Sequence, residues 1–239
     1  MTNLGITTTK ATTTARQTAM FAKESPKQSV QDPVKVVQNA KASDIQANGS
    51  DGQKLVAAAI AEEDGVFSKD EAALMNSCNF ALKQDVKQLN IYNRKTGTVA
   101  IIKYNSLDDF KSEAGKSMIR FVMYMGQNSE VVPNDNPAGG NINADLRSKS
   151  LTFDNLDFSH PNHLWFTDQK CKDFIENVKI LNCDIRRIII GKKSKVKNIT
   201  IGGDTRYHVP ILSDMSTELL VHNGANVKIT GDAQVYRAK

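Results

Sequence analysis

The chain has 239 residues, of which 40% are hydrophobic and 24% are charged, and its mean hydropathy is -0.40. Its net charge of +5 is a mild excess that serves solubility and does not require an acidic partner. No apolar run approaches the roughly 20 residues of a membrane span, so we expect a soluble protein, either cytoplasmic or exported without a conventional signal peptide. The cysteines Cys78, Cys171 and Cys183 lack CxxC spacing, which argues against a zinc knuckle or a disulfide framework.

Residues 1–50 are the most polar part of the chain. The stretch from Met1 to Pro33 is rich in threonine, and no carboxylate precedes Glu24. Such a composition buries too little surface to offset the entropy of ordering, so it predicts a disordered tail that carries no packing to about Asn48. It also resembles the acid-poor leaders of organellar transit peptides and type III secretion substrates, which implies an export or targeting segment.

Two helices are predicted after this tail. The run from Gln53 to Glu63 is rich in alanine and long side chains. A second helix is predicted from Ser68 to about Leu82, in which Ser68 is the N-cap and Glu71 completes a capping box.

The segment between these helices, IAEEDGVFSKDE from Ile60 to Glu71, carries a calcium-loop pattern. Gly65 and Phe67 fall at the sixth and eighth positions of a twelve-residue loop. The segment resembles a single EF-hand loop, and the resemblance implies a calcium site with the ligands Glu62, Asp64, Ser68 and Glu71. Ile60 replaces the aspartate of the first position and so removes a charged ligand. We therefore expect a capped helix-turn-helix with no cofactor, or with weakly bound calcium at most.

The next segment, LNIYNRKTGTVAIIKYN, predicts a β-hairpin with its turn at Arg94 to Gly97. Ser106 then caps a predicted helix that continues to about Met125. Residues 51–126 are therefore expected to form a small α+β domain. The many turn-forming residues of 127–147 predict a linker.

Residues 148–239 contain short apolar runs separated by Asn, Asp, Gly and Ser, which indicates an all-β domain. Four runs share the order Asn, aliphatic, polar, apolar. They begin at Asn155, Asn177, Asn198 and Asn226, which are 22, 21 and 28 residues apart. Such a period is typical of stacked β-solenoid coils, and the region from about Leu151 to Val235 resembles the right-handed parallel β-helix family.

The expected fold class is therefore α+β: a small helix/hairpin/helix domain followed by an all-β parallel β-solenoid, with the repeated asparagines aligned at one corner. A β-sandwich is the alternative, because eight short strands also suit two packed sheets.

Three of the repeats are followed by an acid, namely Asp184, Asp204 and Asp232. In registered coils these carboxylates would stand about 4.8 Å apart, which suits a shared cation or a retaining glycosidase pair. The β-helix resemblance thus implies a lyase or glycosidase as one alternative. Aspartate beside Gly or Asn more commonly closes a turn, so we expect these residues to be structural and assign no catalytic residue.

The densest basic run is a candidate anion-binding site. It consists of Arg186, Arg187, Lys192, Lys193, Lys195 and Lys197. A nucleic-acid binder would need aromatic side chains for stacking beside this run, and the sequence places none there. Lysines that protect a strand edge against aggregation explain the run more simply.

The sequence favours a non-enzymatic binding or interaction protein that presents a β-solenoid surface to a protein or glycan partner. A carbohydrate-active enzyme and a binder of nucleic acid or another anionic surface are the alternatives, and nucleic acid is not the expected partner. The sequence does not determine the oligomeric state.

Overall fold

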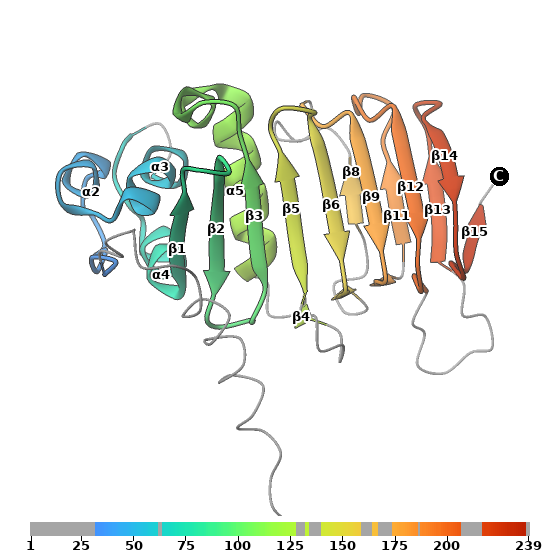
Figure 1. The fold of residues 1–239 in the computed structure, drawn as a ribbon, viewed down its shortest axis with the longest axis horizontal. Helices are drawn as coiled ribbons and strands as arrows, with labels where there is room; N and C mark the ends of the chain where they lie inside the picture. Colours follow the sequence, from blue (N-terminus) through green and yellow to red (C-terminus); the bar gives the residue numbers. More distant parts are fainter. Residues whose placement is uncertain are drawn as a thin grey trace, which may run out of the picture. The chain divides into compact units, whose positions relative to one another are not determined.

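An eight-stranded sheet, which we call the long sheet, is the central element of the fold, with strand order β1-β2-β3-β5-β6-β9-β12-β14 (Figure 1). The structure is a computed structural model and describes residues 32–61, 64–127, 132–133, 140–158, 164–166, 174–185, 187–206 and 217–237. The long sheet comprises β1 (Cys78–Lys83), β2 (Gln88–Asn93), β3 (Val99–Lys103), β5 (Asn141–Asp145), β6 (Ser150–Asp154), β9 (Asn177–Leu181), β12 (Asn198–Gly202) and β14 (Asn226–Ile229). It is open, with edge strands β1 and β14.

Two smaller sheets accompany the long sheet. The three-stranded sheet has the order β10-β7-β4, and the four-stranded sheet has the order β15-β13-β11-β8. Their strands are β4 (Val132–Pro133), β7 (Leu156–Phe158), β8 (Leu164–Phe166), β10 (Asp184–Ile185), β11 (Arg187–Ile190), β13 (Thr217–Val221) and β15 (Val235–Arg237).

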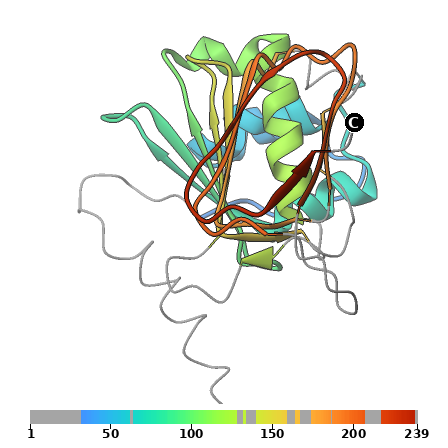
Figure 2. The same cartoon turned by 90° about the vertical axis from the view of Figure 1, so that its right-hand side faces the viewer.

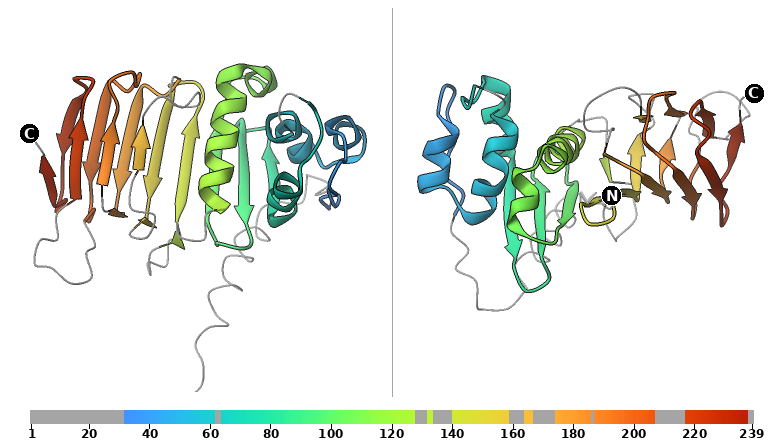
Figure 3. Two further views of the ribbon diagram at one scale, coloured as in Figure 1. Left: turned by 180° about the vertical axis from the view of Figure 1, so that it is seen from behind. Right: turned by 90° about the horizontal axis from the view of Figure 1, so that it is seen from above.

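Among the described residues, the helices all precede β4. They are α2 (Ala42–Asn48), α3 (Asp51–Ile60), α4 (Lys69–Ser77), the short 3-10 helix η1 (Leu107–Lys111) and α5 (Glu113–Gln127). Helix α5 and the four-stranded sheet lie on the same side of the long sheet (Figures 2 and 3). In the described part of the chain, no helix is long and apolar enough to cross a membrane. The fold is therefore mixed, with helices beside a sheet of parallel and antiparallel strands.

Helix α4 begins with the capping box that the sequence predicts. The Oγ of Ser68 accepts a hydrogen bond from the Glu71 backbone N–H (3.2 Å), and Glu71 Oε2 accepts one from the Ser68 N–H (2.8 Å). The helix ends at Ser77, earlier than the predicted Leu82, because the next residues form β1. Pairing with β2 therefore overrides the helical pattern of Cys78–Lys83.

Part of the segment 32–49 is packed, in contrast to the predicted tail. The side chains of Val36 and Ile45 are 2% and 4% exposed. Asn76 holds the Val36 backbone, since its Oδ1 accepts the Val36 N–H (2.9 Å) and its Nδ2 donates to the Val36 carbonyl (2.7 Å). The predicted tail boundary near residue 50 is thus too late. The export or targeting segment stays a prediction, because residues 1–31 lie outside the described residues.

Strand β5 lies inside the predicted linker of residues 127–147. It pairs in parallel with β3 and antiparallel with β6, so it joins the hairpin β2-β3 to the later strands. Its Ile142 and Ala144 side chains are 0% and 1% exposed and face the core. The predicted boundary between two domains therefore falls within one sheet.

From β6 onward the chain follows the same course repeatedly. It runs through the long sheet and the four-stranded sheet and returns beside its previous strand, and the first two courses also contribute β7 and β10 to the three-stranded sheet. We call each course a passage: β6 to β8, β9 to β11, β12 to β13, and β14 to β15. Strands β6, β9, β12 and β14 pair in parallel, as do β8, β11, β13 and β15.

The interior of the passages is a stack of apolar side chains. Phe153, Ile180 and Ile201 occupy one registered position on β6, β9 and β12, and each is 0% exposed. The ring of Phe121 on α5 lies edge-on to Phe153, with centroids 6.3 Å apart. Helix α5 thus extends the core of the passages toward the first half of the chain.

The Asn76 contact provides a test of the N-terminal packing. Replacing Asn76 with Ala leaves the Val36 N–H and carbonyl without their side-chain partner, so it should lower the free energy of unfolding by about 1–3 kcal/mol. Urea denaturation measures this change. The control Asn105→Ala removes an exposed amide, and its free energy of unfolding should stay within about 0.5 kcal/mol of that of the parent. Equal effects of the two substitutions would contradict the assigned role of Asn76.

Candidate functional site

The face of the long sheet that points away from α5, which we call the outer face, carries mainly polar side chains. Side chains alternate between the two faces of a strand, and the inward set is the buried one. Strand register aligns the outward set into rows across β2, β3, β5, β6, β9, β12 and β14. The asparagine row consists of Gln88, Lys103, Asp145, Ser150, Asn177, Asn198 and Asn226. The lysine-threonine row consists of Asn90, Ile101, Asn143, Thr152, Lys179, Thr200 and Lys228.

Three of the four repeated asparagines form a ladder of side-chain hydrogen bonds. The Nδ2 of Asn198 donates to Asn177 Oδ1 (2.8 Å), and the Nδ2 of Asn226 donates to Asn198 Oδ1 (3.3 Å). Asn155 lies elsewhere, at a buried corner with a φ of 56°. Ser150 takes its place beside Asn177, because the first passage enters the long sheet at Ser150.

A ladder of charged side chains precedes the asparagine ladder by one residue. Glu176 accepts hydrogen bonds from Lys149 Nζ at Oε1 (2.8 Å) and from Lys197 Nζ at Oε2 (2.7 Å). These two ammonium groups lower the pKa of Glu176 to about 2. Lys149, Glu176 and Lys197 thus join three successive strands of the long sheet at one end.

The described residues of the basic run lie partly in β11 and partly in the segment between β11 and β12, and they do not line a strand edge. Arg187 opens β11, which is flanked by β8 and β13 and is therefore an inner strand. The exposed Lys192, Lys193 and Lys195 lie in the return from β11 to β12, and Lys197 pairs with Glu176. Edge protection consequently does not explain the run. Arg186 lies outside the described residues.

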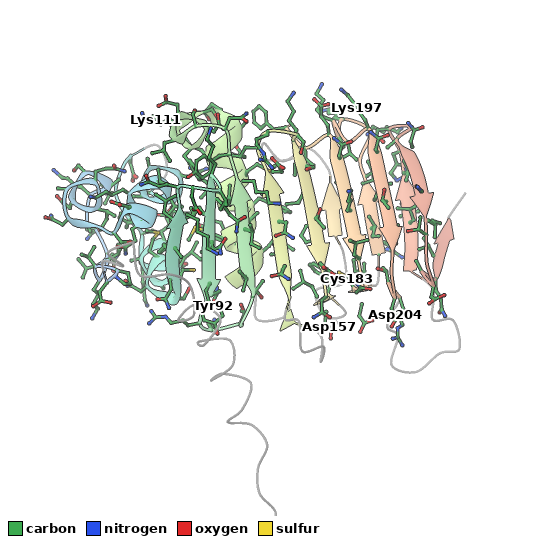
Figure 4. The ribbon with its side chains drawn as sticks, viewed as in Figure 1. Tyr92, Lys111, Asp157, Cys183, Lys197 and Asp204 are labelled. Atoms are coloured by element: carbon green, nitrogen blue, oxygen red, sulfur yellow. The ribbon has the colours of Figure 1, made fainter. Side chains whose placement is uncertain are left out.

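The three predicted acids lie at the opposite end of the strands from Lys197, as Figure 4 shows for Asp204. Asp204 forms an ion pair with Arg206, and its backbone N–H donates to Asn182 Oδ1 (3.1 Å). Asp184 lies in β10, where its backbone is registered with Asp157 and forms an isolated parallel β-bridge with the backbone of Arg206.

Asp232 is exposed, and its N–H donates to the Gly203 carbonyl (3.1 Å). The residues before Asp204 and Asp232, Gly203 and Gly231, stack on one another, whereas the corner residue of the second passage is Asn182, two residues before Asp184. Asp204 and Asp232 therefore occupy equivalent corner positions, and Asp184 is displaced from them along its passage. Their turn-closing role stays a prediction.

The loop that resembles an EF-hand uses its oxygen atoms for local backbone contacts. Asp64 Oδ1 accepts the Val66 N–H (3.0 Å), Ser68 and Glu71 form the capping box, and Gly65 has a φ of +68°. Ile60 is 0% exposed, and Glu62 lies outside the described residues. Among the residues that the structure describes, no group of three or more His, Cys, Asp or Glu side chains is placed to hold a metal ion. The weak calcium site stays a prediction.

Sequence reasoning missed the charged ladder and the lysine-threonine row. The signal for the ladder is the alternation Lys149, Glu176, Lys197, each directly before the first residue of its strand. The signal for the row is the alternation of threonine and lysine at Thr152, Lys179, Thr200 and Lys228, each the third residue of its strand. Comparison with protein-family models, with curated proteins and with solved structures found no match for this chain.

The pKa of Glu176 provides a test of the charged ladder. The folded-state pKa of about 2 lies below the roughly 4.3 of an unfolded glutamate. Ionised Glu176 therefore stabilises the fold above about pH 4.3, and this contribution is lost as the pH falls toward 2. An NMR titration of the Glu176 carboxyl should give the low value in the parent and a value near 4.3 in Lys149→Gln/Lys197→Gln. An unchanged titration in that double variant would refute the assigned pairing.

Proposed function

We propose that residues 148–239 form a short parallel β-solenoid and that the protein is a non-enzymatic binding module that holds a linear acidic glycan on the outer face of the long sheet. The observation that carries the proposal is the alignment of polar side chains into two rows across neighbouring strands.

The repeated course of the chain supports the solenoid. Each passage returns beside its predecessor, and the inward side chains of the second and third passages are buried between the passages on either side. This nearest-neighbour dependence is characteristic of solenoid folds, in which one repeat alone cannot bury its apolar face. The parallel pairing in both the long and the four-stranded sheets supports this architecture over an antiparallel sandwich.

The chemistry of the outer face suits a polyhydroxylated partner. Amide side chains of the asparagine row both donate and accept hydrogen bonds, and threonine hydroxyls do the same. Sugar hydroxyls need both kinds of partner. Because strands repeat about every 4.8 Å, the rows offer such groups at regular intervals to a polymer that itself repeats. Several weak contacts along one chain then add to a useful affinity.

Lys179 and Lys228 favour an acidic glycan over a neutral one. Both side chains are exposed and stand on alternate strands, which places them about 10 Å apart. In the described part of the chain, neither lysine is paired with a carboxylate. The carboxylate of Asp145, in the neighbouring row, forms an ion pair with Arg147, with Oδ2 2.7 Å from Nη2. Two positive charges about 10 Å apart are thus available for uronate or sulfate groups.

Affinity electrophoresis of the purified chain in polygalacturonate gels tests this function. The parent protein should be retarded, and Lys179→Gln/Lys228→Gln should weaken binding about tenfold, since each exposed charged contact contributes up to about 1 kcal/mol. Retardation should weaken as salt increases.

The matched control is Lys192→Gln/Lys193→Gln, which removes the same charge from the return between β11 and β12. Equal losses in the two double variants would show a general charge effect and contradict the outer-face site. Preferential retardation in dextran gels would contradict the acidic glycan. Release of reducing or unsaturated sugar from polygalacturonate, abolished by Asp204→Asn, would replace the binding module with an enzyme.

A further inference from the structure

The fourth passage, β14 to β15, leaves apolar side chains exposed at positions that are buried in the preceding passages. Ile180, Ile201 and Ile229 occupy one registered position, and their exposed fractions are 0%, 0% and 43%. Val178 and Ile199 are each 1% exposed, whereas the equivalent Val227 is only partly buried. The difference arises because β14 has a paired neighbour on one side only.

Among the described residues, two strand edges are left unpaired at this end of the structure. Strand β14 is the last strand of the long sheet, and β15 is the last strand of the four-stranded sheet. Figure 2 looks onto this end and shows the two strands on opposite sides of the interior. A docking partner therefore has to satisfy two edges at a fixed separation and cover the apolar side chains between them.

This geometry discriminates between kinds of partner. A single extended peptide could pair with one edge and would leave the other edge open. The opposite end of the passages cannot be the docking partner. There the long sheet continues from β6 into β5 and β3, and α5 packs against the core. The same end of a second copy presents two edges of matching kind and separation.

We propose that two copies of this chain dock end to end through β14 and β15. A two-fold axis perpendicular to the long sheet pairs β14 with its own copy in antiparallel fashion and brings β15 to its own copy at the same time. The contact is self-complementary and closes at two copies, as isologous interfaces do. This inference does not depend on the proposed glycan.

Charge restricts the strand register of the contact. Opposed residues in an antiparallel pair point to the same face, so the outward Lys228 cannot lie directly opposite its own copy without repulsion. The two neighbouring registers that preserve the inward face place either Val227 or Ile229 opposite itself. Both registers cover Ile229 with apolar side chains. Lys228 thereby selects against one register while leaving the apolar contact intact.

The arrangement has a consequence for the outer face. A two-fold rotation about an axis perpendicular to the sheet keeps both outer faces on the same side. The two long sheets then form one continuous sheet, and a single linear polymer can lie along both copies.

Sedimentation equilibrium of the full chain across micromolar concentrations tests the inference. The parent should approach twice the monomer mass of 26.3 kDa. Ile229→Lys places a charge at the centre of the contact and should shift the dimer dissociation constant upward by at least tenfold. Ile229→Ser, which removes the apolar side chain without adding charge, should act in the same direction and keeps the test decisive if the lysine variant fails to fold.

The matched control is Val86→Lys, in the turn between β1 and β2, whose side chain is 54% exposed. It adds the same charge at a comparably exposed apolar residue and should leave the dimer unchanged. A monomeric parent at every concentration, a dimer that persists in a folded Ile229 variant, or an open-ended series of larger species would each overturn the inference.

Discussion

Parallel pairing of β6, β9, β12 and β14 in one continuous register is the constraint on which the rest of the structure depends. The inward side chain of each strand is buried chiefly by the same position on its neighbours, as with Phe153, Ile180 and Ile201. A slip of one residue would reverse the inward and outward sets. The core and the outer face are therefore set by the same hydrogen-bond register.

The corners of the passages preserve that register. Asn155, Asn182, Gly203 and Gly231 have φ values of 56°, 53°, 61° and 66°, a region that glycine and asparagine tolerate best. A Cβ on Gly203 would also lie 2.1 Å from Asn182 Oδ1. A side chain at position 203 would therefore have to displace the Asn182 amide, so glycine is favoured there for space as well as for conformation. Asp204 and Asp232 directly follow these corner glycines. The two Gly-Asp pairs of the sequence therefore mark positions where the backbone adopts a positive φ.

The two ends of the passages differ, and this difference underlies both proposals. At the first end, α5 and β5 continue the core and the sheet, so the outer face extends over strands from both halves of the chain. At the other end, β14 and β15 are open and Ile229 is exposed. A polar face of regular spacing favours an extended ligand, whereas an apolar end with two open edges favours a partner of its own shape.

Local signals in the sequence were sufficient to predict a structural feature where the residues that determine it lie close together in the chain. The capping box of Ser68 and Glu71, the turn at Arg94–Gly97 and the alignment of the last three repeated asparagines are of this kind, because each rests on a few adjacent residues or on a repeat. Only the tertiary structure decided the assignment of Cys78–Lys83 and Asn141–Asp145 to strands, the packing of Val36 against Asn76 and the pairing of Glu176 with two lysines. These features depend on partners at least five residues away, and mostly more than twenty, which local propensity does not encode. The sequence by itself thus determined the capped start of α4 and the repeat of Asn177, Asn198 and Asn226, and the three-dimensional pairing of distant strands decided which polar residues share the outer face and which strands of the described residues lie at the sheet edges.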